Sequence, residues 1–125
     1  MKSNIMSTSK KYDLEDRFVK FAGETILFCN KLPNDRAGIT LCDQLTRSST
    51  SAALNFGEAQ GAYSTKDMIF RLSISLKELK ESRVAFKIIN YIEYSNLDTT
   101  KFQKECEELI AIVASIIKNK RTNKL

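Results

Sequence analysis

The sequence predicts an all-α protein, an antiparallel up-down-up-down four-helix bundle. Three observations indicate this fold. The 125 residues include only one Pro and four Gly, which favours long uninterrupted helices over a turn-rich β fold. Four segments repeat apolar residues at alternating spacings of three and four, which is the period of one helix face. The links between these segments are short, and short links make consecutive helices antiparallel.

The first helix is expected at about residues 14–32. Asp13 can cap its start, because a side-chain oxygen at that position accepts a hydrogen bond from a free backbone amide. Pro33 ends it, because proline disfavours helical geometry at the residue before it. The inward face consists of Leu14, Phe18, Phe21, Thr25, Phe28 and Leu32.

The second helix is expected at about residues 36–60. Its middle is rich in small side chains, which allow another helix to approach closely. Gly61 is predicted to follow the helix in a left-handed conformation, which glycine adopts without steric cost. The inward face consists of Leu41, Leu45, Ser48, Ala52, Asn55 and Ala59.

The third and fourth helices are expected at about residues 65–94 and 99–118. Ser64 or Thr65 can cap the third helix, and Asp98 can cap the fourth. Both helices have an inward face with the same spacing as the first two. These faces are Ile69, Leu72, Leu76, Leu79, Arg83, Phe86 and Asn90 in the third helix, and Phe102, Cys106, Leu109, Val113 and Ile116 in the fourth.

The last two helices contain more apolar residues than one face requires. A helix that is apolar over more than one face contacts more than one neighbour. The additional residues indicate either a surface for self-association or a fuller monomer core, and periodicity alone does not separate these alternatives. They are Ile74, Ile88, Ile89, Ile92, Ile110, Ile112 and Ile117.

The net charge of +5 is distributed unevenly along the chain. Residues 1–11 and 119–125 are predicted to be flexible basic tails on either side of a bundle at residues 12–118. Residues 1–11 and 118–125 together carry +7, which leaves 13 basic and 15 acidic residues, a net charge of −2, in between. We therefore expect any nucleic-acid contact to come mainly from the basic ends or from a local cluster of basic residues. The candidate contact residues are Lys2, Lys10, Lys11, Lys118, Lys120, Arg121 and Lys124.

The composition excludes several classes of functional site. The chain has no His, which removes Ser-His and Cys-His pairs and most zinc sites. Cys29, Cys42 and Cys106 fall on apolar helix faces, and we expect buried reduced thiols. The acidic cluster at residues 105–108 is expected to be a solvated face rather than a metal site. With no nucleotide-binding or hydrolase motif present, we expect no catalytic residue, cofactor or metal.

No membrane segment is predicted. No run approaches the roughly 20 apolar residues of a membrane span, and residues 1–11 lack an apolar stretch of signal-peptide length. We therefore expect a cytoplasmic protein with no membrane partner.

A set of six polar residues is predicted to form bonds between helices. Asn55 and Arg83 occupy inward positions, and Glu58 and Glu78 lie at the margin of an inward face. A buried charge is tolerated only when it is paired, so Glu58 and Glu78 are expected to face arginines of a neighbouring helix. We expect a structural rather than a catalytic role for the set, which is Arg47, Asn55, Glu58, Arg71, Glu78 and Arg83.

Two sequence blocks, QLTRSSTSAALNFGEAQG and RLSISLKELKES, resemble those of the four-helix-bundle proteins encoded in 23S ribosomal RNA intervening sequences of bacteria. The resemblance covers about residues 12–117. It implies a bundle that assembles as a homopentamer. It extends more distantly to the accessory variability proteins of diversity-generating retroelements, which form pentameric barrels and bind a reverse transcriptase and nucleic acid. The matching residues are Gln44, Arg47, Ser51, Asn55, Glu58, Lys66, Asp67, Ser75, Leu76, Glu78 and Leu79.

The leading functional hypothesis is a non-enzymatic oligomeric binding module that contacts nucleic acid, either RNA or DNA, or a nucleoprotein through basic surfaces. The alternative is a protein-interaction scaffold that binds another protein and has no nucleic-acid role. The weakest interpretation is a carboxylate-based enzyme that uses Glu58, Glu78 and an arginine, because it needs perturbed carboxylates in an open pocket.

Overall fold

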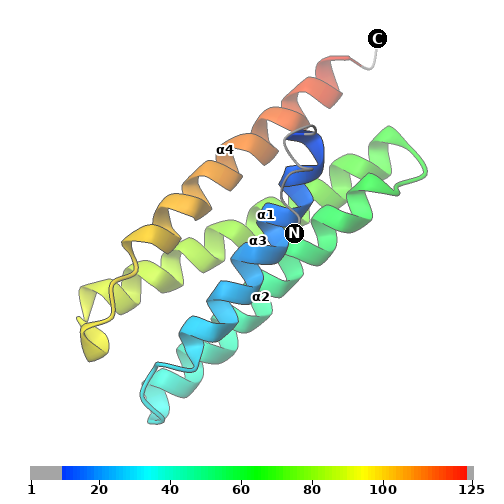
Figure 1. The fold of residues 1–125 in the computed structure, drawn as a ribbon. Coiled ribbons are helices and arrows are strands. Elements are labelled where there is room, and N and C mark those ends of the chain that lie inside the picture. Colours follow the sequence, from blue (N-terminus) through cyan, green and yellow to red (C-terminus); the bar gives the residue numbers. More distant parts are fainter. Residues whose placement is uncertain (1–9, 124–125) are drawn as a thin grey trace, which may run out of the picture.

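The computed structural model describes residues 10–123, which form four antiparallel α-helices and no strand (Figure 1). Helix α1 spans Lys10–Cys29, α2 spans Arg36–Gln60, α3 spans Thr65–Tyr91 and α4 spans Thr100–Thr122. A short 3₁₀ helix, η2, occupies Tyr94–Asn96 in the last link. The predicted all-α up-down-up-down bundle is therefore confirmed. No helix among residues 10–123 combines the length and the apolar content needed to cross a membrane.

The four helices do not contact one another equally. The most extensive contact joins α2 to α3, while α1 packs on α2 and α4 packs on α3. Helices α1 and α4 touch only slightly, and Figure 1 shows α4 set apart from α1. The bundle is therefore open along its α1–α4 side.

Two helix starts are capped by side chains. Asp35 accepts a hydrogen bond from the Gly38 amide at 2.9 Å at the start of α2. Ser64 accepts one from the Asp67 amide at 3.1 Å at the start of α3, as predicted. A Cβ atom at Gly38 would lie 1.8 Å from the carbonyl oxygen of Pro33. The link between α1 and α2 therefore requires glycine at this position.

The predicted roles of three capping residues are wrong. Helix α1 begins at Lys10, so Asp13 lies inside it instead of capping it. The residue at the cap position of α4 is Thr99 rather than Asp98. Asp98 lies one residue before it and accepts a hydrogen bond from the Thr100 amide at 3.0 Å. Gly61 follows α2 as predicted but has a φ of −103° rather than a left-handed value, and its amide donates to the Glu58 carbonyl at 3.1 Å.

The core is built largely from the predicted faces. Phe18 of α1 stacks on Phe56 of α2 with ring centroids 4.6 Å apart. Phe86 of α3 lies 5.6 Å from Phe28 of α1 and 4.7 Å from Phe102 of α4. These rings join three helices near the link between α3 and α4.

The predicted inward face of α3 is only partly correct. Arg83 is half-buried and Asn90 is exposed, whereas Ser75 and Ser82 are fully buried. Helix α3 packs on both α2 and α4, so its buried surface is a wide arc instead of one stripe.

Serine and alanine side chains make the closest part of the α2–α3 contact. The Ser48 and Ser82 hydroxyls lie 2.6 Å apart, and the Ser75 hydroxyl donates to the Ala52 carbonyl at 2.8 Å. Because these side chains are so small, the side chain of Ser75 on α3 reaches the backbone of α2 across the interface. The expected close approach at the small-sided part of α2 is therefore present.

Replacing Ser75 by Leu is expected to lower the free energy of unfolding by about 1–3 kcal/mol, because extra methylene groups in a packed contact force the helices apart. Ser75→Ala removes only one neutral hydrogen bond and should cost about 0.5–1.5 kcal/mol. Urea denaturation of both variants measures the difference. A leucine variant as stable as the alanine variant would show that close contact is not required here.

Candidate functional site

Five of the six predicted polar residues lie along the outer edge of the α2–α3 contact, in two groups. In the first group, Arg47 of α2 bonds to Glu78 of α3 at 3.1 Å and to Glu81 at 2.6 Å. Its guanidinium also donates to Gln44 at 3.3 Å. The hydrogen bond to Glu81, supported by Glu78, raises the pKa of Arg47, so the arginine remains charged.

The second group lies closer to the link between α2 and α3. Arg71 bonds to Glu58 at 3.2 Å and to the Asn55 side-chain oxygen at 3.2 Å. The Asn55 amide in turn donates to the Ser51 carbonyl and hydroxyl, at 3.0 and 3.2 Å. The guanidinium of Arg71 also lies 5.6 Å from the centroid of the Phe70 ring.

The two acidic residues of the predicted set differ in exposure. The Glu78 side chain is 9% exposed, whereas the Glu58 side chain is 60% exposed. The prediction of a buried pair is therefore wrong for Glu58, because the second group sits on the outer rim of the helix contact. Arg83 takes part in no ion pair among the described residues, and its Nε atom is buried without a hydrogen-bond partner there.

The acidic cluster on α4 forms an ion-pair network that the sequence reasoning missed. Arg17 of α1 binds Glu105 with two bonds, at 2.7 and 3.0 Å, and Glu108 at 2.9 Å. These bonds raise the pKa of Arg17, chiefly through Glu105. Glu105 and Glu108 are thus not only a solvated face, and they link α1 to α4 across the open side of the bundle.

The cysteine side chains offer no reactive centre. Cys29 and Cys106 are buried, Cys42 is half-buried, and all three are free thiols. Burial raises the pKa of the Cys29 and Cys106 thiols to about 12 each, so both are protonated near neutral pH. Within residues 10–123, no three Cys, Asp or Glu side chains converge in an arrangement that could hold a metal ion.

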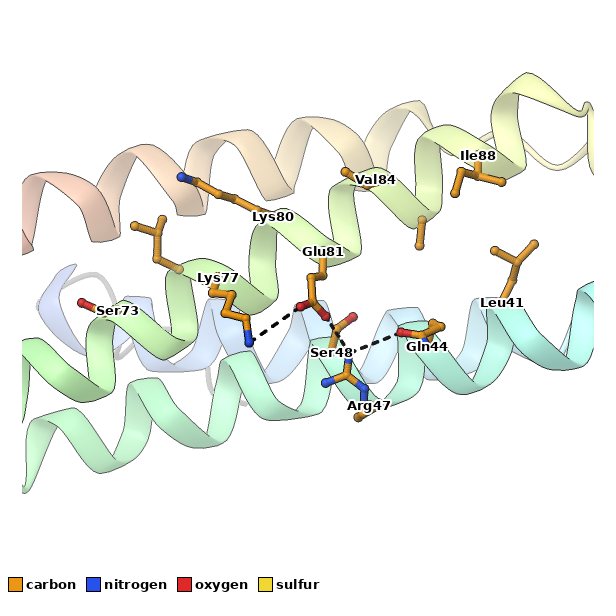
Figure 2. A pocket seen from close by; sticks show the side chains of 12 residues that line it. Leu41, Gln44, Arg47, Ser48, Ser73, Lys77, Lys80, Glu81, Val84 and Ile88 are labelled. Carbon is orange, nitrogen blue, oxygen red and sulfur yellow. Dashed lines mark hydrogen bonds and ion pairs between the residues drawn. The ribbon is translucent and has the colours of Figure 1, made fainter.

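A groove of about 950 Å³ runs along the outer side of α3 beside α2. Figure 2 shows that its two halves differ in character. Leu41, Val84 and Ile88 lie in one half, and Lys77 and Lys80 lie in the other. The ion-paired residues of the first polar group stand between them, and the lining residues are Leu41, Gln44, Arg47, Ser48, Ser73, Leu76, Lys77, Lys80, Glu81, Val84, Ala85 and Ile88.

A second groove, of about 430 Å³, continues from the first between α3 and α4. The two grooves share Ser73 and Leu76. Lys118 and Arg121, near the end of α4, line the second groove, and Lys120 is exposed beside them.

Not all of the predicted basic residues can be placed. Lys2 and Lys124 lie outside the described residues. Lys10 and Lys11 belong to the first turn of α1, and residues 118–122 belong to α4 rather than to a tail. Lys77 and Lys80, which line the groove, were not predicted. Their position becomes evident only once α3 has been packed against its neighbours.

Comparisons with known proteins agree with the fold. A family model described as "23S rRNA-intervening sequence protein" matches residues 10–115. A crystal structure of a protein with unknown function from the S23 ribosomal protein family of Bacteroides thetaiotaomicron VPI-5482 superposes with a TM-score of 0.77 at 27% sequence identity. The match covers 84% of this chain and 98% of that chain. A comparison with curated proteins finds no match.

The two ion-paired groups are expected to contribute differently to stability. Arg47→Ala leaves the buried Glu78 carboxylate without its cation, which should cost about 1–3 kcal/mol. Arg71→Ala breaks a pair whose acid is largely solvated, which should cost less than about 1 kcal/mol. Urea denaturation of the two variants tests the order.

A Glu78→Gln change in the Arg47→Ala background is the control, because it removes the unpaired charge and should recover part of the loss. Equal destabilisation by Arg47→Ala and Arg71→Ala would contradict the difference in burial.

Proposed function

The chain belongs to the 23S rRNA-intervening sequence protein family, and from this membership we propose that it is a non-enzymatic oligomeric module that binds RNA or a ribonucleoprotein. The family description and the ribosomal-protein family of the structural neighbour both support a ribosomal RNA context. The observation that carries the proposal is the gathering of basic residues at one end of the bundle.

The last turns of α4 supply the described part of this basic end. Lys118, Lys120 and Arg121 are exposed, and no ion pair among residues 10–123 involves them. Lys118 and Arg121 line the groove between α3 and α4. Unpaired cations beside a groove are free to neutralise phosphates, which is the main source of affinity for nucleic acid.

The topology brings further basic residues to the same end. Antiparallel packing places the start of α1 and the start of α3 at the same end of the bundle as the end of α4 (Figure 1). Lys10 and Lys11 lie in the first turn of α1, and Lys66 lies in the first turn of α3. One end of the bundle thus combines basic residues from three helices.

We extend the proposal to a homopentamer, the assembly that the sequence resemblance implies. The bundle leaves several large apolar residues on its surface, among them Val19, Leu27, Leu54, Phe70 and Val84, each more than half exposed. Repeating the basic end in five copies would convert weak phosphate contacts into multivalent binding.

An enzymatic role has less support. Glu58 and Glu78, the carboxylates of the enzyme hypothesis, are both engaged by arginines. The second candidate function is a protein-interaction scaffold, and the apolar half of the α3 groove favours it.

Replacing Lys118, Lys120 and Arg121 together by Gln is expected to weaken binding to an RNA hairpin and to flatten its dependence on salt. Each lost phosphate contact should reduce the slope of log affinity against log salt by about 0.7–0.9. Gel-shift titrations from ~50 mM salt upward measure both effects.

The matched control replaces three exposed basic residues at the opposite end, Lys31, Arg36 and Lys87, by Gln and should leave the slope nearly unchanged. Undetectable binding by the wild-type protein at low salt would overturn the nucleic-acid role. Recovery of a protein partner after nuclease treatment would then favour the scaffold.

The oligomeric part of the proposal predicts a solution mass near five times the 14.2 kDa of one chain. Light scattering coupled to size-exclusion chromatography measures this mass. A mass of 14.2 kDa across the concentration range would overturn the assembly while leaving monomeric RNA binding open to the titration above.

A further inference from the structure

The apolar half of the α3 groove is an unoccupied surface. We call the residues Leu41, Val84 and Ile88 the groove patch. Val84 is 52% exposed and Ile88 is 45% exposed, although both lie on a regular α-helix beside a well-packed core. Lys77 and Lys80 follow on the same outer side of α3, towards its start.

A second apolar surface lies on α1, outside its inward face. We call the residues Val19, Ile26 and Leu27 the α1 stripe, and their exposed fractions are 61%, 39% and 64%. Glu15 and Asp16, both exposed, precede the stripe at the start of the helix. The α1 stripe therefore begins with acids, whereas the groove patch is preceded by lysines.

Ile26 and Leu27 of the α1 stripe lie at the same height along the bundle as the groove patch. Helices α1 and α3 run in the same direction, and the rings of Phe28 and Phe86 lie 5.6 Å apart in the core. Ile26 and Leu27 directly precede Phe28, and Val84 precedes Phe86 by two residues. A rotation about an axis parallel to the helices would therefore bring the α1 stripe of one copy level with the groove patch of another.

One pair of charges beside the two surfaces is also matched in height and opposite in sign. The offset between Phe28 and Phe86 places Asp16 within one helical turn of the level of Lys77. Lys80, Glu15 and Asp16 take part in no ion pair among residues 10–123, and Lys77 reaches Glu81 only at 4.0 Å. These charges remain available to a second copy.

We infer that the α1 stripe of one copy packs into the groove patch of the next, with Asp16 facing Lys77. The inference rests on the oligomeric part of the proposed function and names the interface. Because the two surfaces differ, the contact is head-to-tail, and repeating it generates a ring when the rotation closes.

The test uses two variants of the full chain that each damage one surface. Leu27→Asp damages the α1 stripe and Val84→Asp damages the groove patch, and light scattering should show a large loss of oligomer for each. A mixture of the two should form a heterodimer of twice 14.2 kDa by native mass spectrometry. The intact stripe of one variant can fill the intact groove of the other, but the chain cannot extend further.

The matched control is Leu54→Asp, which changes a residue 63% exposed on α2 and outside both surfaces, and it should keep the wild-type mass. Circular dichroism checks that each variant is folded, and serine at the same positions replaces any aspartate variant that is not. If the two aspartate variants keep the wild-type mass, or do not pair when mixed, the proposed interface is wrong, but the proposed oligomer still stands. A monomeric wild-type protein overturns the oligomer itself, and the interface with it.

Discussion

The close contact of α2 with α3 determines which side chains lie on the surface along the edge of these two helices. Serine and alanine side chains let the two backbones approach until Ser75 reaches the Ala52 carbonyl. At that separation the longer side chains of the two helices cannot enter the contact and must lie along its edges. The arginine–glutamate groups and the groove beside them occur there for this reason.

Burial divides the polar residues at this edge into two kinds. Glu78 is nearly excluded from water and needs its arginine, because a desolvated carboxylate without a partner is costly. Glu58 is mostly in water, where an ion pair contributes little. The same residue types in neighbouring turns of the same two helices therefore differ in what they contribute to the fold.

Sequence periodicity was sufficient for the fold and for the inward faces of α1 and α4, because each of these helices has one main packing partner. It failed for α3, where two neighbours widen the buried arc to include Ser75 and Ser82. It also could not find the Arg17 network, since Arg17 and Glu105 are 88 residues apart in the chain. The pairing of Glu58 and Glu78 with arginines of the neighbouring helix could be anticipated from charge alone. The exposure of Glu58 could not, because it depends on where the edge of the α2–α3 contact lies.

Because α1 and α4 make only slight contact with each other, each of these two helices has one main packing partner, whereas α2 and α3 each have two. Helix α4 is held by α3 along one side and by the Arg17 bonds and the Phe28–Phe102 rings, 5.1 Å apart, on the other. Helices α1 and α4 are therefore the two least extensively packed helices, and local opening is expected to begin with them rather than with α2 or α3. Since Lys118, Lys120 and Arg121 belong to α4, part of the surface proposed to meet nucleic acid is carried by one of these two outer helices.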